Sequence, residues 1–391
     1  MIRRTAEAAL RELSARYPVV TVTGPRQSGK TTLARACFAG LGYANLEQPD
    51  VRRFAVEDPR GFLRQHARGA VLDEFQRAPE IVSYLQAEVD ADAAPGRFIL
   101  TGSEQLEVLN RVSQSLAGRT GLLKLLPFSI EEMSGKYPVR PLERLIYSGF
   151  YPRIHDQGLE PAQALADYFA TAVQRDLRSL MNVGDLIAFE RFVRLCAGRC
   201  AQLLSLSALG ADAGVSHTTA TKWLSLLEAS YIVFRLPPYF WNTNKRLVKS
   251  PKLFFFDVGL AAHLLGIQSA AHVLAHPLRG ALFENLVVVE TLKYFWHRAR
   301  RAALHFYRDS GGNEIDLLIE LGHGVFPLEI KAGETVNPDY FHGLRAFARL
   351  YDQPPKGGAL VYAGSEVQER SGTWVLPPER LPELLAPLAG V

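Results

Sequence analysis

Short apolar runs alternate with amphipathic stretches over the first third of the chain. Four of these runs are predicted to be strands, because each is short, rich in aliphatic residues and followed by turn or polar residues: residues 18–23, 70–74, 97–103 and 121–126. Helices are predicted between them, beginning near residues 30 and 81. Strands that alternate with helices indicate a parallel sheet covered on both faces. The pattern therefore predicts an α/β domain.

The middle of the chain has mainly helical spacing, interrupted by turn residues at 148–152. Further on, a short helix, a turn, a second helix and a strand follow in the order typical of a winged helix: residues 204–209, 214–216, 217–229 and 232–236. The outward face of the second helix offers five polar side chains, His217, Thr218, Thr221, Lys222 and Ser225. Only Lys222 among them carries a full charge. DNA binding and a structural or domain-contact role therefore stay open as alternatives.

The last third contains two predicted strands, residues 314–320 and 325–331, joined by a hairpin turn. A two-residue turn at Gly322 and His323 pairs Asp316 with Glu329 and Glu314 with Lys331, and all four side chains then share one face. A bulge at Pro327 would shift this register. The cluster suits a divalent metal with a lysine that stabilises charge, and the alternative is a set of cross-strand ion pairs.

The composition changes this picture little. The chain has 391 residues, enough for two or three domains, and it is 48% hydrophobic and 21% charged. Its formal charge of +4 does not by itself indicate nucleic acid binding. Basic residues form two groups, which suit either a solvated face or a phosphate-facing surface: Lys245, Arg246, Lys249 and Lys252, and Arg298, Arg300, Arg301 and Arg308.

The three cysteines, Cys37, Cys196 and Cys200, are too few for a disulfide framework and lack the partners of a metal site. We expect them to be buried. The first residues lack the apolar segment of a signal peptide, and no apolar run is long enough to span a membrane. A soluble, cytoplasmic protein without a membrane partner is predicted.

A phosphate-binding loop follows the first predicted strand. Its residues are Gly24, Pro25, Arg26, Gln27, Ser28, Gly29, Lys30 and Thr31, and Thr32 continues into the predicted helix. Strand, glycine-rich loop, Gly-Lys-Thr and helix make up the full context of a P-loop. The glycines let backbone N–H groups approach phosphate oxygens, Lys30 is predicted to reach the β- and γ-phosphates, and the Thr31 hydroxyl is predicted to bind Mg2+.

Two carboxylates end the second of the four runs. Asp73 is predicted to hold the magnesium ion, and Glu74 is the candidate base that orients and deprotonates water. Thr101 or Ser103 is a candidate sensor of the γ-phosphate at the end of the third run. Arg119 is a candidate arginine finger or sensor, and a surface or capping arginine is the alternative.

Taken together, the chain resembles the AAA-superfamily P-loop ATPases of bacteria and archaea that carry a C-terminal domain of unknown function, a domain similar to the PD-(D/E)XK restriction-endonuclease fold. The resemblance rests on a series of segments in this order: residues 24–31, 72–76, 100–103, 116–119, 175–176, 280–285, 314–316 and 328–331. It implies ATP as the nucleotide. It also matches Glu284, Asp316, Glu329 and Lys331 to the nuclease signature, with Asp316 and Glu329 as ligands of a second magnesium ion.

The fold class that we expect is therefore a multidomain α/β protein. Its predicted domains are a P-loop, AAA-like ATPase with a parallel sheet and flanking helices (residues 1–135), a helical lid with a winged helix (136–245) and an α/β nuclease-like domain (246–391). Two hypotheses of function follow. In the first, ATP hydrolysis controls a module that acts on DNA. In the second, the protein is a nucleotide-dependent switch or scaffold with an inert C-terminal domain that binds a protein partner. An arginine finger acting across subunits would require an oligomer.

Overall fold

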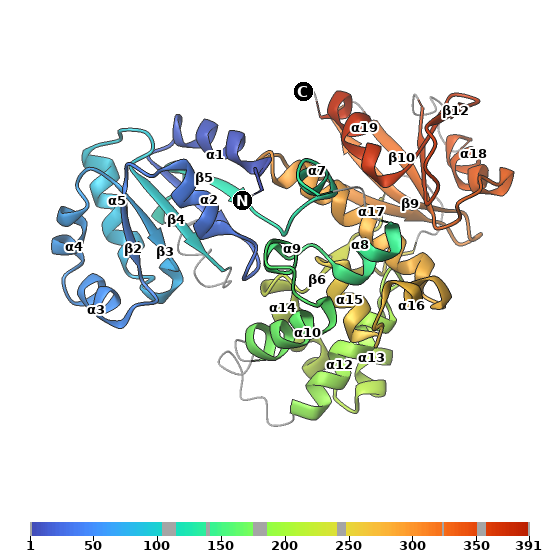
Figure 1. Cartoon of the computed structure of the whole chain (residues 1–391), viewed down its shortest axis with the longest axis horizontal. Helices are drawn as coiled ribbons and strands as arrows, with labels where there is room; N and C mark the ends of the chain where they lie inside the picture. Colours follow the sequence, from blue (N-terminus) through green and yellow to red (C-terminus); the bar gives the residue numbers. More distant parts are fainter. Residues whose placement is uncertain are drawn as a thin grey trace. The chain divides into compact units, whose positions relative to one another are not determined.

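The computed structural model describes most of the chain (Figure 1): residues 2–103, 115–137, 141–174, 186–240, 248–322, 324–349 and 357–389. Arg175, Asp176, Lys245, Arg246 and His323, all named above, lie outside the described residues. The chain divides into two compact units. The first comprises Met1–Phe128, Ala229–Tyr231 and Phe295–Arg300, and the second comprises Ser129–Glu228, Ile232–Tyr294 and Arg301–Val391.

The first unit contains a five-stranded sheet in which all described strand pairs are parallel. Its strand order is β2-β3-β4-β1-β5. The strands are β1 (Val19–Thr23), β2 (Gly42–Asn45), β3 (Ala70–Asp73), β4 (Phe98–Gly102) and β5 (Thr120–Lys124). The predicted parallel sheet is confirmed, with β2 as a strand that the hydrophobic pattern had not indicated. Tyr43 and Gly42 in β2 are exposed, so this strand lacks the apolar run of the others.

Helices cover both faces of this sheet, because side chains alternate along each strand. Leu72 and Leu100 pack in one core, with residues of α3 (Pro49–Glu57), α4 (Pro59–Gln65) and α5 (Ile81–Ala91). Val71 and Ile99 pack in the other core, with residues of α1 (Ala6–Ser14) and α2 (Lys30–Cys37). Each fully buried aliphatic side chain of this kind stabilises the fold by roughly 1.5–3 kcal/mol.

The second unit begins with helices. These are α7 (Ile130–Ser134), α8 (Leu142–Ser148), α9 (Pro152–Asp156), α10 (Pro161–Tyr168), a π-helical segment (Phe169–Gln174), α12 (Leu186–Gly198), α13 (Leu206–Ala213) and α14 (His217–Ala229). Strand β6 (Val233–Leu236) follows α14 and pairs antiparallel with β7 (Lys252–Phe255).

The helices and strand expected for a winged helix are thus present, and a winged helix stays a prediction. Ser205 caps α13 by accepting a hydrogen bond from the Ala208 N–H, and Gly214 ends it in the left-handed region. On α14, Trp223 packs edge-on against two phenylalanines of α12. Leu224 and Leu227 are buried beside Trp223, whereas Leu226 is half-buried. Positions 220, 223, 224 and 227 keep the 3.6-residue period of the buried face.

The rest of the second unit contains a mixed six-stranded sheet of order β12-β13-β11-β10-β9-β8. Its strands are β8 (Leu304–Arg308), β9 (Glu314–Leu321), β10 (Gly324–Lys331), β11 (Ala359–Tyr362), β12 (Gln368–Arg370) and β13 (Thr373–Leu376). Its helices are α15 (Val258–Leu264), α16 (Ala270–Ala275), α17 (Arg279–Trp296), α18 (His342–Ala348) and α19 (Leu381–Leu388). Short 3-10 turns lie at Phe75–Arg77, Pro338–Phe341 and Pro378–Arg380.

The predicted hairpin register is the one observed. Leu321 pairs with Gly324 and Leu317 with Leu328, and the pair of Leu318 with Pro327 shows that this proline does not shift the register. The irregularity lies instead between β8 and β9, at His305 and Tyr307.

The turn at residues 148–152 is held by a buried aspartate. Asp257 accepts a hydrogen bond from the Phe150 N–H at 2.8 Å and also caps α15 through the Leu260 N–H at 3.0 Å. Gly149 has φ +60° and ψ −158°, a conformation open essentially to glycine alone. A Cβ at Gly149 would overlap the Asp257 carboxylate. The turn therefore joins α8 to α15.

Over the part of the chain that the structure describes, no helix is both long and apolar enough to cross a membrane.

Replacement of Gly149 by alanine is expected to destabilise the protein strongly, because it adds a clash with Asp257 to backbone strain. Gly158→Ala is the matched control, since Gly158 has φ +63° but open space around its Cβ position. We expect a loss of about 1 kcal/mol for the control and at least ~3 kcal/mol for Gly149→Ala, measured by urea unfolding. Equal losses in the two variants would show that the Asp257 contact is unimportant.

Candidate functional site

The loop between β1 and α2 has a backbone path that requires glycine at both ends. Gly24 has φ +150°, and a Cβ at this position would overlap the carbonyl oxygen of Leu125. Gly29 has φ +93° and forms the N-cap of α2. Because α2 begins at Lys30, its N-terminal N–H groups and the positive end of its dipole lie at the loop, where an anion binds favourably.

Lys30 lies folded into this loop. Its side-chain nitrogen donates hydrogen bonds to the carbonyl oxygens of Gly24 at 3.0 Å and Pro25 at 2.8 Å. Burial lowers the pKa of Lys30 to about 8, although Glu74 and Asp73 act in the opposite direction. The Ser28 hydroxyl beside it is buried and has no hydrogen-bond partner among the described residues. Buried donors without a firm partner are costly, so the loop is suited to bind an anionic group.

Asp73, at the end of β3, is the point on which hydroxyl groups converge. Its carboxylate accepts hydrogen bonds from the hydroxyls of Thr31 at 2.9 Å, Tyr43 at 2.9 Å and Thr101. In the described residues no group of three or more His, Cys, Asp or Glu side chains could hold a metal ion. A nucleotide-bound magnesium ion does not need such a group, since one carboxylate, one hydroxyl, phosphate oxygens and water suffice. Thr31 and Asp73 fit that set.

Glu74 follows Asp73 in the left-handed region, with φ +55°. Such strain in a non-glycine residue costs of the order of 1–3 kcal/mol and is common at functional sites. The Glu74 carboxylate accepts a hydrogen bond from the Gln76 side chain, which also donates to the Ser103 hydroxyl at 3.0 Å. The sequence left the choice between Thr101 and Ser103 open. The structure gives them different partners: Thr101 contacts Asp73, and Ser103 is linked to Glu74 through Gln76.

Arg119 lies at the amino ends of the strands, whereas the P-loop lies at their carboxyl ends. Its carbonyl accepts a hydrogen bond from Val19, the first residue of β1, whereas the P-loop follows Thr23, the last residue. Its guanidinium binds Asp90 at 2.5 and 3.0 Å. This position gives no support to a sensor role of Arg119 in its own P-loop, and that role stays a prediction. A finger role toward another subunit stays a prediction.

Arg4 is a P-loop contact that the sequence did not single out. Its guanidinium donates to the carbonyl oxygens of Ser28 and Leu126, each at 2.7 Å, and lies over the Phe128 ring. Arg4 is 8% exposed. An arginine 20 residues before the loop carries no motif, so only the tertiary structure reveals it.

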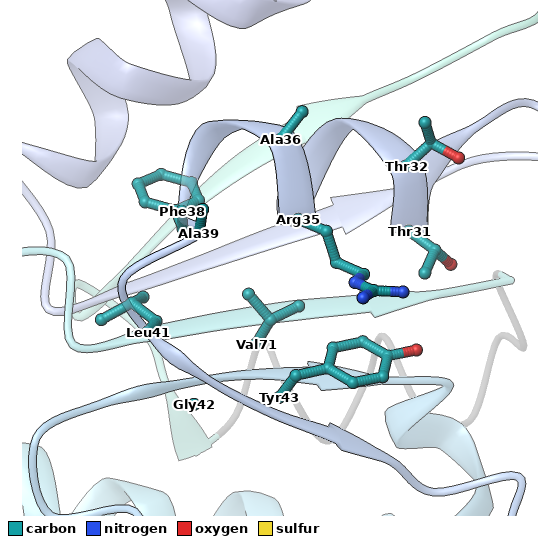
Figure 2. A pocket seen from close by; sticks show the side chains of 10 residues that line it. All are labelled: Thr31, Thr32, Arg35, Ala36, Phe38, Ala39, Leu41, Gly42, Tyr43 and Val71. Carbon is teal, nitrogen blue, oxygen red and sulfur yellow. The ribbon is translucent and has the colours of Figure 1, made fainter.

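A pocket of about 440 Å³ opens beside Thr31, between α2 and β2 (Figure 2). The guanidinium of Arg35 and the hydroxyl of Tyr43 point toward the end of the pocket where Thr31 lies, whereas Phe38, Ala39 and Leu41 line the other end. The Arg35 guanidinium stacks on the Tyr43 ring at 4.7 Å from its centroid. Burial, followed by the Asp73 hydrogen bond, raises the pKa of Tyr43 to about 12.

The second unit brings the C-terminal candidates together through two lysines. Lys331 contacts Asp316 at 2.8 Å and Glu329 at 2.7 Å. Lys252, from β7, contacts Glu284 at 2.8 Å and Glu314 at 2.5 Å. Glu314 and Lys331, which were expected to be paired, have different partners. Lys252 and Arg308 contact Glu314, whereas Lys331 contacts Asp316 and Glu329.

Lys252 corrects an expectation. It was assigned to a basic surface group, yet its side chain is only 4% exposed. Position 252 begins a strand whose four residues are all buried, and this burial overrides the local run of basic residues. The carboxylates of Glu284, Asp316 and Glu314 outweigh burial and raise the pKa of Lys252, so its ammonium stays charged.

The pKa values of the carboxyl groups in this cluster are shifted in different directions. Burial raises the pKa of Glu284 to about 8, and burial together with Asp316 raises that of Glu329 to about 9. Although burial acts in the opposite direction, Lys331 and Lys252 lower the pKa of Asp316.

The neighbouring helix α17 has a structural contact as well. Asn285 accepts a hydrogen bond from the Phe255 N–H at 2.7 Å and donates one to the Phe255 carbonyl at 3.0 Å. All three cysteines are buried free thiols, and Cys200 donates to the same Asn285 oxygen.

A P-loop at the carboxyl edge of a five-stranded parallel sheet defines the first unit as a P-loop domain of the ATPase class. Residues 16–134 match the model of an AAA domain, which confirms the AAA part of the resemblance. Residues 139–271 and 279–381 match two domains of unknown function, DUF8612 and DUF4143. A nuclease-like fold for the last domain therefore stays a prediction.

The chain is 32% identical over 380 residues to the uncharacterized protein Rv2008c of Mycobacterium tuberculosis, a match that covers 96% of this chain and 83% of the relative. An uncharacterized protein of Mycobacterium bovis matches equally, and one of Haemophilus influenzae is 24% identical over 310 residues, covering 70% and 74%. The chain belongs to the same protein family as the mycobacterial proteins.

Among solved structures, a Walker-type ATPase of Pyrococcus abyssi is similar with a TM-score of 0.44 and 15% identity, covering 66% of this chain and 94% of that one. RuvB of Thermotoga maritima follows with a TM-score of 0.33 and 17% identity, covering 60% and 90%.

Replacement of Arg4 by alanine is expected to destabilise the protein by about 2–4 kcal/mol, because two hydrogen bonds from a charged donor to buried carbonyls are lost. Nucleotide affinity should fall as well, since the Ser28 carbonyl is no longer held. Arg3→Ala is the matched control, because the Arg3 side chain is 90% exposed. Thermal unfolding and nucleotide titration check both effects, and an Arg4 variant that behaves like the control would refute the role of Arg4.

Proposed function

We propose that this protein binds ATP with magnesium and hydrolyses ATP at the loop from Gly24 to Thr31. The observation that carries the proposal is the contact of Thr31 with Asp73 at 2.9 Å beside the buried Lys30. These three side chains, on two elements far apart in sequence, form the combination that phosphate and magnesium require. Glu74, next to Asp73, completes the site with a base.

Each residue has a defined part in the reaction. The Lys30 ammonium would exchange its two carbonyl partners for β- and γ-phosphate oxygens, with backbone N–H groups of the loop and of Thr32 around the phosphates. Thr31 and Asp73 would hold magnesium, which supplies neutralisation of phosphate charge. Glu74 would orient the attacking water and accept its proton, and Gln76 and Ser103 would fix the Glu74 carboxylate.

The wider organisation is also part of the proposal. We infer three domains with boundaries after residues 135 and 245, and a cytoplasmic location. The exposed face of α14 carries one lysine, Lys222, and gives little support to tight DNA binding. Assembly into an oligomer would give Arg119 a site to act on.

Of the two hypotheses for the last domain, the position of Lys252 favours a catalytically inert module. Its ammonium lies against Glu284 and Glu314, and Lys331 lies against Asp316 and Glu329. Both pairs of carboxyl groups are therefore already satisfied by tethered cations. A divalent ion at Asp316 and Glu329 would have to displace Lys331, whose side chain is 32% exposed, and one at Glu284 would have to displace the buried Lys252 and leave its charge unpaired.

The ATPase proposal predicts a separation of binding from turnover. Lys30→Ala should weaken ATP binding and turnover at least tenfold, whereas Glu74→Gln should bind ATP normally and turn it over about 10²–10⁴ times more slowly. Glu57→Gln, an exposed site on α3, is the control. Phosphate release and nucleotide titration, each with ATP and GTP, measure both quantities. Unchanged binding and turnover in Lys30→Ala would refute the proposal.

The inert-module hypothesis predicts that the wild-type protein does not cleave duplex DNA in the presence of magnesium, with or without ATP. Lys331 contacts Asp316 and Glu329, and Lys252 contacts Glu284, so the carboxyl groups that a metal ion would need are paired with lysines. A gel assay that compares wild type with Asp316→Ala tests this expectation. Cleavage by the wild type that is lost in Asp316→Ala and retained in Lys30→Ala would favour the nuclease hypothesis instead.

A further inference from the structure

Tyr43 contacts the candidate site although it lies outside the P-loop motif. It lies on β2, which pairs in parallel with β3 so that Tyr43 is opposite Val71 and Asn45 is opposite Asp73. Its ring therefore has to extend along the sheet to bring the hydroxyl to Asp73, at 2.9 Å from Oδ2. Tyr43 is 39% exposed, so the side chain adds little to the hydrophobic core.

The two oxygens of Asp73 have different environments. Thr101 donates to Oδ1, whereas Tyr43 donates to Oδ2, and Thr31 lies within 3.0 Å of both. A threonine hydroxyl has one proton and can serve one oxygen at a time. Once the Thr31 oxygen turns to a metal ion, Thr101 and Tyr43 are the donors left to hold the carboxylate, one on each oxygen.

Arg35 holds the Tyr43 ring in place. It lies four residues after Thr31, so both side chains project from the same face of α2. The Arg35 guanidinium stacks on the ring at 4.7 Å from its centroid (Figure 2). This contact restricts the ring while the hydroxyl donates to Asp73. A chain of contacts thus runs from Arg35 through Tyr43, both in the pocket between α2 and β2, to Asp73.

We propose that Tyr43, held by Arg35, is a positioning residue that orients Asp73 for the magnesium ion bound with the nucleotide. The inference rests on the proposed ATP site and adds to it a residue from the strand at the edge of the sheet. Residues that hydrogen-bond to a metal-binding carboxylate fix its orientation, and their loss commonly lowers metal affinity about 10–100-fold.

The test separates magnesium-dependent from magnesium-independent binding. A fluorescent ATP analogue is titrated into the full-length protein at increasing magnesium concentration and, separately, in EDTA. We expect Tyr43→Phe to raise the magnesium concentration for half-maximal binding about tenfold and to leave the affinity in EDTA unchanged. Arg35→Met should shift the magnesium requirement in the same direction by a smaller factor.

Tyr84→Phe is the matched control, because Tyr84 lies half-exposed on α5, away from Asp73. It should behave like wild type. Unchanged affinity in EDTA also shows that the Tyr43 variant is folded. The same magnesium requirement in wild type and Tyr43→Phe would overturn the role of Tyr43. A wild-type protein that binds no nucleotide under either condition would overturn the ATP site itself, which is a different result.

Discussion

Asp73 accepts hydrogen bonds from hydroxyl groups on three other elements: Thr31 on α2, Tyr43 on β2 and Thr101 on β4. This convergence depends on the parallel register of the sheet, which places the carboxyl ends of β1, β3 and β4 at one edge. A carboxylate that is 4% exposed costs several kcal/mol in desolvation unless donors satisfy it. The hydroxyl donors and the strand order therefore support each other, and the P-loop chemistry depends on both.

The backbone near this carboxylate also adopts unusual conformations that help to form the site. Gly24 passes against the Leu125 carbonyl, and Glu74 takes a left-handed conformation directly after Asp73. The Arg4 guanidinium also holds the P-loop, because it donates a hydrogen bond to the Ser28 carbonyl oxygen. Strain of this kind persists only where surrounding contacts determine the conformation. The site is thus preorganised by contacts that lie outside the P-loop motif.

In the second unit, acidic residues that match a metal-binding signature are paired with lysines. Asp316, Glu329 and Glu284 match the nuclease signature, but Lys331 contacts Asp316 and Glu329, and Lys252 contacts Glu284. Whether carboxylates bind a metal or a lysine depends on which cation the fold brings nearest. Here β7 brings Lys252 into the cluster from outside the β9–β10 hairpin, and so the arrangement favours an internal ion-pair network.

The sequence by itself determined what depends on neighbouring residues: the P-loop, the Asp73–Glu74 pair, the parallel sheet and the hairpin register of β9 and β10. Each follows from local spacing, turn geometry or alternation, which the chain carries in consecutive positions. Only the tertiary structure decided that Arg119 lies at the amino ends of the strands, that Lys252 is buried among carboxylates, and that Arg4 and Tyr43 reach the site. The contacts of Arg4 with Ser28, Tyr43 with Asp73, Arg119 with Asp90 and Lys252 with Glu284 span at least 24 residues of sequence. Packing selects such partners, and local patterns do not encode it.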